Sequence, residues 1–398
     1  MRILFLTPEL PFPAESGGTI KTASILEHLR KRHEVHVLCF RRRALSEAQA
    51  RWCDEPGGVE TVPLSRGRNP ANLARSYLSG LPLSVERNRS ASMARLVAGH
   101  LGRGYDSVFV DSWLMAQYLP EGSARPALLH EHNAEYLLWQ RQADREANPL
   151  LRALLRQEGR RVRRYEAAIL SRFATVFAVS EADRRALAAL GAEPDRLRLL
   201  PNLPDPTLLE LPPLSFDATR PLLLYFGTLS WQPNVEGLNY FLREVLPLVR
   251  QRLPDVSFVI AGRGAGPSLH RLARRSAGVE FLGPVADAEP LYRQARLFVE
   301  ASHSGGGTRL KLLNALARGL PVVTTPVAAE GLDASAGEHL LIAADATAMS
   351  DAIVRLMADD ALWRALSENG RRLIRQRYLP DIAYRALDEV LSGAGAAA

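Results

Sequence analysis

The chain of 398 residues is 47% hydrophobic and has a formal net charge of +7; this length predicts two globular domains, each with its own core. No apolar run is long enough for a transmembrane helix, and the apolar start after Met1 is too short for a signal peptide. Cys39 and Cys53 are the two cysteines, which excludes a disulfide framework, and no metal-ligand spacing surrounds them. We therefore expect a cytoplasmic protein without a metal site.

The excess positive charge lies in the first half of the chain. Residues 1–199 carry 30 Arg and Lys against 22 Asp and Glu, whereas the remainder carries 20 against 21. This asymmetry indicates an anionic partner for the first half. The aromatic and basic interleaving of a nucleic-acid platform is absent, so we expect an anionic membrane surface or a phosphate-bearing lipid, and no nucleic acid.

The first elements predict the start of a doubly wound domain. An apolar strand at Ile3–Thr7 leads through a loop with Gly17 and Gly18 into a helix, and Val35–Phe40 is the next strand. A glycine pair at a helix start admits a phosphate close to backbone N–H groups, although the same pair is common in plain turns.

The middle of the first half contains an arginine-rich segment and a histidine with two interpretations. Residues 41–100 are irregular, and predict either solvated loops between short helices or a surface that faces an acceptor. Strands are expected at Ser107–Asp111, Ala127–Glu131 and Ala174–Ser180. His132 directly follows the second of these, at the strand end where doubly wound folds bind ligands. It is either a functional group, as a base or a donor to a sugar, or a packed residue.

A long amphipathic helix is expected from Leu150 to Phe173. Its apolar stripe predicts one buried face, and its many arginines lie on the other faces. Such a basic face is either solvated or lies on anionic lipid.

The second half of the chain repeats the doubly wound pattern. Residues 1–200 form the first expected domain, the proline-rich residues 201–220 a linker, and residues 221–375 a second domain. Residues 376–398 are expected to be a C-terminal helix that packs back on the first domain. The glycines that begin at Gly262 do not have the spacing of a dinucleotide fingerprint.

One stretch of the second half predicts an anion site. A strand at Arg296–Val299 passes through the glycines Gly305–Gly307 into a helix that stops before the strand Val322–Thr325. This arrangement points backbone N–H groups at a phosphate. Arg309 and Lys311 lie just inside the helix start, where they would neutralise a diphosphate. Glycine loops on two such domains predict a ligand between them.

These motifs resemble those of a known family, the retaining GT4 glycosyltransferases, and more closely the bacterial sugar transferases of exopolysaccharide and cell-surface glycan assembly. The resemblance implies the GT-B fold, an α/β architecture of two Rossmann-like domains that face each other across a cleft. The segments that carry it are Ser16–Gly18, His132–Glu135, Ser180–Asp183, Leu200–Asn202, Phe226–Asn234, Gly305–Lys311 and Gly319–Val323.

The resemblance also implies roles for particular residues. The donor, a nucleotide-diphosphate sugar, would bind the second domain, and His132 would contact its sugar or orient the acceptor. Neither a metal nor another cofactor is implied. The acceptor would be a glycan or a polyprenyl-diphosphate-linked lipid. The enzyme would reach it as a peripheral protein of the cytoplasmic membrane. The implied donor-binding residues are Gly17, Gly18, Gly227, Thr228, Gly306, Gly307, Thr308, Arg309, Lys311 and Asn314.

The chain departs from the family at one pair of positions. The family often carries two glutamates separated by seven residues, and here these positions are Gly306 and Asn314. The second glutamate normally binds the ribose hydroxyls, for which Asn314 offers a neutral hydrogen bond instead of a charge-assisted one. The nucleotide, the sugar and the acceptor stay open. A non-catalytic GT-B protein that binds nucleotide sugars and a sugar-nucleotide epimerase are the alternative functions.

Overall fold

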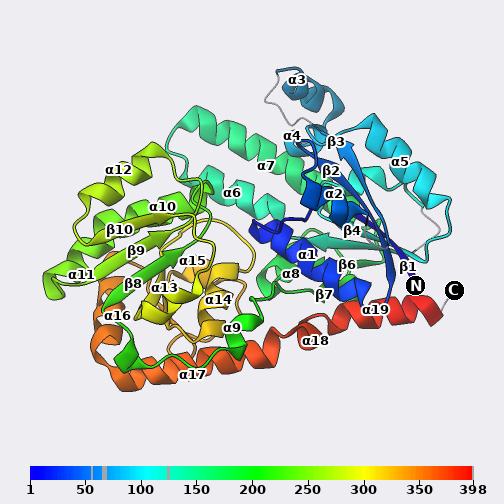
Figure 1. Cartoon of the computed structure of the whole chain (residues 1–398). Helices are drawn as coiled ribbons and strands as arrows, with labels where there is room; N and C mark the ends of the chain where they lie inside the picture. The colour runs from blue at the N-terminus through cyan, green and yellow to red at the C-terminus, as the bar shows by residue number, and fades with distance from the viewer. Residues whose placement is uncertain (55–56, 65–69, 123–125, 397–398) are drawn as a thin grey trace. The chain divides into compact units, whose positions relative to one another are not determined.

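The computed structural model describes residues 1–54, 57–64, 70–122 and 126–396 (Figure 1). The chain forms two compact units, of which the first comprises Met1–Pro201 with Tyr384–Ala398 and the second comprises Asn202–Ala383. Of the segment expected as a linker, residues 202–220 belong to the second unit, where they include a helical turn, α9 (Thr207–Glu210). The last helix, α19 (Arg385–Ala396), belongs to the first unit.

The first unit is built on a parallel sheet of seven strands in the order β3-β2-β1-β4-β5-β6-β7. The predicted interior strands are confirmed, whereas the two edge strands were not predicted. Edge strands are covered less well, so their apolar pattern is weak: two of the three residues of β7 are exposed. The strands are β1 (Arg2–Thr7), β2 (Glu34–Arg41), β3 (Val59–Pro63), β4 (Ser107–Asp111), β5 (Ala127–Glu131), β6 (Thr175–Ala178) and β7 (Leu197–Leu199).

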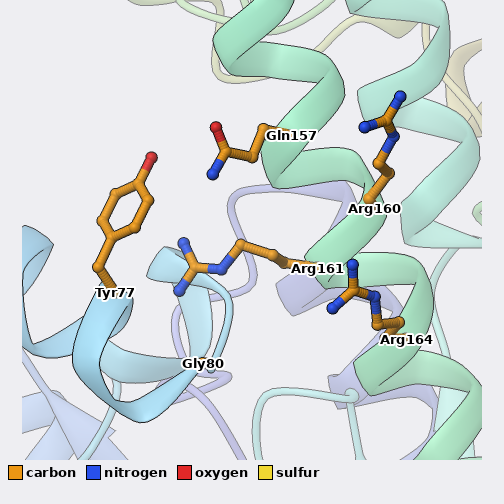
Figure 2. A pocket seen from close by; sticks show the side chains of 6 residues that line it. All are labelled: Tyr77, Gly80, Gln157, Arg160, Arg161 and Arg164. Carbon is orange, nitrogen blue, oxygen red and sulfur yellow. The ribbon is translucent and has the colours of Figure 1, made fainter.

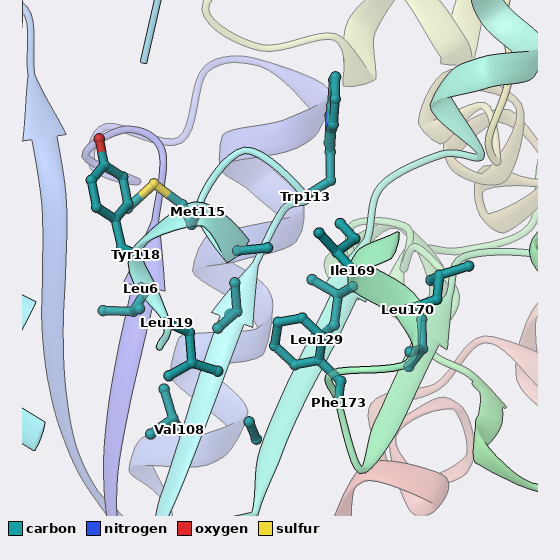
Figure 3. Packing of buried hydrophobic residues seen from close by; sticks show 14 of the residues in the cluster. Leu6, Val108, Trp113, Met115, Tyr118, Leu119, Leu129, Ile169, Leu170 and Phe173 are labelled. Atoms are coloured by element: carbon teal, nitrogen blue, oxygen red, sulfur yellow. The ribbon is translucent and has the colours of Figure 1, made fainter. Parts of the chain in front are cut away.

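Helices cover this sheet and close its core. Helix α7 begins at Pro149, behind the Asn148 side chain that caps its first turn, and its last turns pack Ile169 and Leu170 against the strands (Figure 3). The helices are α1 (Gly17–Arg30), α2 (Glu47–Cys53), α3 (Pro70–Ser79), α4 (Leu83–Glu86), α5 (Ala91–Leu101), α6 (Glu135–Arg145), α7 (Pro149–Leu170) and α8 (Glu181–Ala188), with 3-10 turns at Ala116–Tyr118 and Pro194–Arg196.

The second unit is a parallel sheet of six strands in the order β10-β9-β8-β11-β12-β13. This is the strand order of a Rossmann fold, with two halves that diverge from the central pair β8 and β11. The strands are β8 (Leu222–Phe226), β9 (Ser257–Ala261), β10 (Val279–Gly283), β11 (Leu297–Glu300), β12 (Val322–Thr324) and β13 (Leu341–Ile342).

The helix expected from Val235 to Gln251 is interrupted in the structure. A π-helical turn at Phe241–Val245 separates α10 (Gln232–Tyr240) from α11 (Leu246–Arg252). Pro247, the second residue of α11, has no N–H to continue the α-helical ladder. The remaining helices are α12 (Pro267–Arg275), α13 (Glu289–Gln294), α14 (Leu310–Arg318), α15 (Pro326–Ala329), α16 (Ala346–Ala358), α17 (Asp360–Arg377) and α18 (Pro380–Ala383), with a 3-10 turn at Phe216–Ala218.

Because all strands within a sheet are parallel, their carboxyl ends meet at one edge of that sheet. Thr7 and Asp111 end β1 and β4 in the first unit, and Phe226 and Glu300 end β8 and β11 in the second. In such sheets this edge is where ligands bind. Within the described ranges, no helix combines the length and the apolar character that crossing a bilayer requires.

Candidate active site

The glycine turn after β11 is shaped by the arginine that follows it. Gly305 and Gly307 have φ values of 103° and 66°, which favour glycine. A Cβ atom at Gly305 would lie 2.6 Å from an Nη atom of Arg309. The buried Arg309 guanidinium donates to the Ser304 carbonyl oxygen at 2.6 Å. Arg309 therefore holds the turn closed from the start of α14.

Lys311 is held by a buried counter-ion. Its ammonium group forms an ion pair with Glu300, the last residue of β11, and donates to the Tyr225 hydroxyl at 2.7 Å and to Asn234 Oδ1 at 2.8 Å. Both cations that the sequence assigns to a diphosphate are thus engaged by groups of their own unit. Sequence reasoning missed Glu300, although it is the one acid from the start of β11 to Lys311.

Burial and charge set the protonation of this pair. Burial lowers the pKa of Lys311 to about 8, even though Glu300 opposes the shift. Burial alone would raise the pKa of Glu300, but Lys311 and Arg309 outweigh it and the pKa falls below its usual value. At neutral pH the cluster therefore contains two cations and one carboxylate, an excess of positive charge that suits an anion.

The loop after β8 lies beside Lys311. A Cβ atom at Gly227 would lie 3.5 Å from Lys311 Nζ, and the Thr228 carbonyl accepts from Asn234 Nδ2 at 2.7 Å. Gly262, after β9, must be glycine because a Cβ there would lie 1.8 Å from the Gly227 carbonyl oxygen. The structure thus brings Gly227, Thr228 and Lys311 together.

Asn314 lies one turn further along α14. Its Oδ1 atom accepts the Asp205 N–H at 2.9 Å, and its side chain is half-buried. Thr308, before α14, is tied to the same segment, because Asn202 Nδ2 donates to the Thr308 carbonyl at 2.9 Å. Gly306 and Gly307 between these contacts are half-buried.

In the first unit, the predicted residue His132 belongs to a hydrogen-bonded network around Asp111. Both oxygens of this fully buried carboxylate are engaged. Oδ1 is 2.7 Å from His130 Nδ1 and 2.9 Å from His132 Nε2; Oδ2 accepts from Thr22 at 2.6 Å and from Thr7 at 3.1 Å. Asp111 and His130 were not predicted as site residues.

The two histidines of this network titrate differently. Burial, assisted by the neighbouring His132, lowers the pKa of His130 to about 3. Burial also acts against a charged His132, but the Asp111 carboxylate outweighs it and raises the pKa of His132. His130 is therefore a neutral support, whereas His132, which is partly exposed, is the histidine that takes up a proton.

Among the described residues, two groups have ligand atoms close enough together to hold a metal ion: Asp111 with His130 and His132, and His36 with Glu60 and His100. In the first group, the hydrogen bonds described above already use the carboxylate and one nitrogen of each ring. In the second group, Glu60 Oε1 lies 3.1 Å from His36 Nε2 and 2.8 Å from His100 Nε2. Hydrogen bonding accounts for both arrangements.

Gly17 and Gly18 form the first turn of α1, behind the Ser16 capping box. A Cβ atom at either position would meet nothing within 4 Å, so packing within the chain does not require glycine there. One turn on, Lys21 is buried, with its ammonium 4.6 Å from the centre of the Tyr384 ring. Burial lowers the pKa of Lys21 well below its usual value, although Asp111 opposes the shift.

The comparisons with known proteins agree with this architecture. Residues 16–203 match the family model described as "Glycosyl transferase 4-like domain", and residues 220–359 match "Glycosyl transferases group 1". The chain therefore belongs to the GT4-type glycosyltransferases and is an enzyme of this class with the GT-B fold.

Among curated proteins, an "Uncharacterized 44.6 kDa protein in cps region" of Klebsiella pneumoniae is 23% identical over 393 residues, covering 95% of this chain and 96% of the relative. A phosphatidyl-myo-inositol mannosyltransferase of Mycobacterium leprae is 31% identical over 150 residues, which are 35% of this chain and 39% of the relative.

Among solved structures, HepE of Anabaena in complex with UDP-glucose superimposes with a TM-score of 0.67 at 17% identity, covering 99% of this chain and all of HepE. Sucrose-phosphate synthase of Thermosynechococcus elongatus has a TM-score of 0.71 at 19% identity, and each chain is fully covered.

Proposed function

We propose that this glycosyltransferase moves a sugar from a nucleotide-diphosphate sugar to a glycan or polyprenyl-diphosphate-linked acceptor of a bacterial surface polysaccharide, with retention at the anomeric carbon. The cluster of Lys311, Arg309 and Glu300 beside the glycine turn is the observation that carries the proposal. The UDP and UDP-glucose complexes of HepE support such a donor, and the relative from a cps region supports the polysaccharide role.

The chemistry explains why cations are needed at this turn. The bond between the anomeric carbon and the diphosphate oxygen breaks, and the same carbon bonds to an acceptor oxygen, whose proton passes to the leaving phosphate. Negative charge therefore grows on the diphosphate, where Lys311, Arg309 and backbone N–H groups would stabilise it. Lys311 would exchange part of its interaction with Glu300 for the diphosphate, while His132 would contact the sugar or orient the acceptor.

The remaining donor contacts are assigned by the same proposal. Asn314 would accept from a ribose hydroxyl in place of the family's glutamate. Seven further residues would contact the phosphates and the sugar through their backbone: Gly17, Gly18, Gly227, Thr228, Gly306, Gly307 and Thr308. A lipid-linked acceptor lies at the membrane, so we also propose that the protein attaches peripherally to its cytoplasmic face through the basic first half.

Alanine substitution of the two cations tests the proposal. We expect Lys311→Ala and Arg309→Ala each to lower the transfer rate by about 10²–10³, the usual cost of one lost donor to a developing charge. Donors are first identified by the thermal shift that UDP, GDP and dTDP sugars cause. Arg271→Ala, at an exposed site on α12, is the matched control. Full activity in either variant would disprove the diphosphate assignment.

The same assay separates the alternative functions. An epimerase would release an altered nucleotide sugar when the acceptor is omitted. A protein that only binds nucleotide sugars would show the thermal shift without any transfer. Neither result is expected here.

A further inference from the structure

Large apolar side chains are exposed on two neighbouring helices of the first unit. Leu78, near the end of α3, is 89% exposed, and Leu150 and Leu154, in the first turns of α7, are 77% and 56% exposed. Leu73, Tyr77 and Leu151 are also exposed on these helices. Half of the exposed large hydrophobic residues in the described chain thus lie on two of its helices. Such a concentration marks an interaction surface.

Leu150 and Leu154 of α7 do not belong to the face that packs on the sheet. Leu150, Leu154, Gln157, Arg161 and Arg164 follow one another at spacings of four, three, four and three, which places them on one side of the helix. The buried residues, including Val162, Glu166 and Ile169, lie on a different side. Arg161 is the buried member of this stripe and donates a hydrogen bond to Ser76 of α3. The exposed members, Leu150, Leu154, Gln157 and Arg164, lie away from the face that packs on the sheet.

The same stripe leads into a basic pocket of about 390 Å³ between α3 and α7. Tyr77 of α3 faces Gln157 and Arg161 of α7, and Arg160 and Arg164 project from the same helix one turn apart (Figure 2). The pocket is open beside Gly80, since no atom outside its chain neighbours lies within 4 Å of the position that a Cβ atom would take there.

The arginines of the pocket differ in burial and in their hydrogen-bond partners. Arg161 is buried and paired: it donates to Glu158 Oε2 at 2.8 Å and to Ser76 Oγ at 2.7 Å, and lies 4.8 Å above the centre of the Tyr77 ring. It thereby joins α3 to α7 and neutralises Glu158. Arg160 and Arg164 are exposed, and within the described ranges neither forms an ion pair or a hydrogen bond. The pocket thus presents two uncompensated cations.

We infer that the surface formed by α3 and the exposed stripe of α7 docks on a membrane that contains anionic phospholipid, with a lipid phosphate bound by Arg160 and Arg164. The leucines would enter the boundary between headgroups and acyl chains, while the guanidinium groups match the phosphates in charge and geometry. The inference rests on the proposed function, since an enzyme that glycosylates a lipid-linked acceptor must meet the membrane, and it names the surface that does so.

Vesicle co-sedimentation of the full chain tests the inference. The wild-type protein should bind vesicles of phosphatidylcholine with phosphatidylglycerol, and bind phosphatidylcholine alone weakly. Arg160→Ser/Arg164→Ser should weaken binding to the anionic vesicles about 25-fold, since each basic residue near such a surface contributes about fivefold. Leu78→Ser/Leu150→Ser/Leu154→Ser should weaken it by about tenfold or more.

Controls separate this inference from general charge and from catalysis. Arg271→Ser/Arg275→Ser removes an equally spaced, exposed pair from α12 and should leave vesicle binding unchanged. All variants should keep the thermal shift with the donor, which reports the fold and the donor site. Vesicle binding needs no transfer reaction, so it can succeed even if the proposed function fails.

Three results would overturn the inference. In the first, the wild-type protein does not bind anionic vesicles, as expected if the surface docks another protein. In the second, the arginine or leucine variants bind like the wild type. In the third, inorganic phosphate stabilises the wild-type protein but not the arginine variant, while neither sediments with vesicles, which would identify a site for free phosphate.

Discussion

The ion pair between Lys311 and Glu300 changes how the anion site predicted at the glycine turn is interpreted. Two neighbouring cations at a glycine turn suggest a preformed anion site, but Glu300 already neutralises one of them, Lys311. A buried carboxylate keeps the lysine in place and limits the cost of burying its charge. An incoming diphosphate must therefore compete with Glu300, and the outcome depends on whether Lys311 is protonated.

This dependence predicts how donor affinity changes with pH. Below a pKa of about 8, Lys311 is an ammonium group, and above it the side chain becomes neutral. We expect the affinity for UDP to be constant on the acidic side and to fall by about tenfold per pH unit above about 8, as one-proton linkage requires. Isothermal titration calorimetry between pH 6.5 and 9.5 measures this.

Lys311→Arg is the control for the titrating group, because a guanidinium stays charged over this range. Its affinity should show no decline that begins near pH 8. If the arginine variant declines like the wild type, a group other than Lys311 titrates, and the link between its pKa and donor binding is wrong.

At the scale of elements, the glycine that ends α14 and the glycine pair that starts α1 differ in what requires glycine. In α14 glycine is required by the structure, since the C-cap Gly319 has φ 80° and a Cβ there would lie 2.9 Å from Arg371 Cδ. In α1, neither Gly17 nor Gly18 has a positive φ or a neighbour within 4 Å. Packing explains the first glycine, and the proposed phosphate contact explains the pair.

Gly18→Ala tests that explanation. The substitution should leave the free energy of unfolding unchanged or raise it by about 0.5–1 kcal/mol, since alanine favours a helix over glycine. The transfer rate should nevertheless fall at least about tenfold, because a methyl group would keep a phosphate from the N–H groups of the first turn. Urea unfolding and the transfer assay measure the two effects.

Gly319→Ala gives the opposite pattern and serves as the comparison. The left-handed conformation alone should lower the free energy of unfolding by about 1–2 kcal/mol, before the contact with Arg371 is counted. If Gly18→Ala leaves the transfer rate intact, Gly18 has no part in donor binding.

The element pattern also shows where prediction from sequence succeeds. Interior strands such as β1, β4 and β11 are continuous apolar runs bounded by turn residues, and both the strands and their order along the chain were predicted. The edge strands β3 and β7 were missed because polar residues, Glu60 and Thr61 in β3 and Arg198 in β7, interrupt the apolar run. The break between α10 and α11 was missed because an apolar helical period continues through it.

At the scale of the whole molecule, the first unit is formed by two separate segments of the chain. After completing the second unit, the chain returns to the first, where Tyr384, Leu387 and Leu391 are buried. Tyr384 also bonds to Ser24 at 2.8 Å, and Asp388 lies 2.8 Å from His28 Nε2. The C-terminal helix therefore covers α1 and stabilises the first unit.

Truncation after Ala383 should destabilise the first unit alone. Removing three buried side chains at about 1.5–3 kcal/mol each predicts a loss of about 5 kcal/mol or more. Hydrogen exchange measured by mass spectrometry should show faster exchange in α1 and unchanged protection in α14. A chain that ends at Ser392 keeps all three residues and should behave like the full chain, and unchanged exchange in α1 after the longer truncation would contradict the prediction.

The sequence by itself determined the class of the protein, the two Rossmann-like sheets, the glycine turn and the identity of its cations. These features are local, because apolar runs, glycines and prolines dictate the backbone within a few residues. Only the tertiary structure decided that Glu300 pairs with Lys311, that Asp111 joins His130 and His132, and that α7 presents leucines beside a basic pocket. These arrangements join residues from different strands and helices, and local sequence patterns do not encode which distant side chains the fold brings into contact.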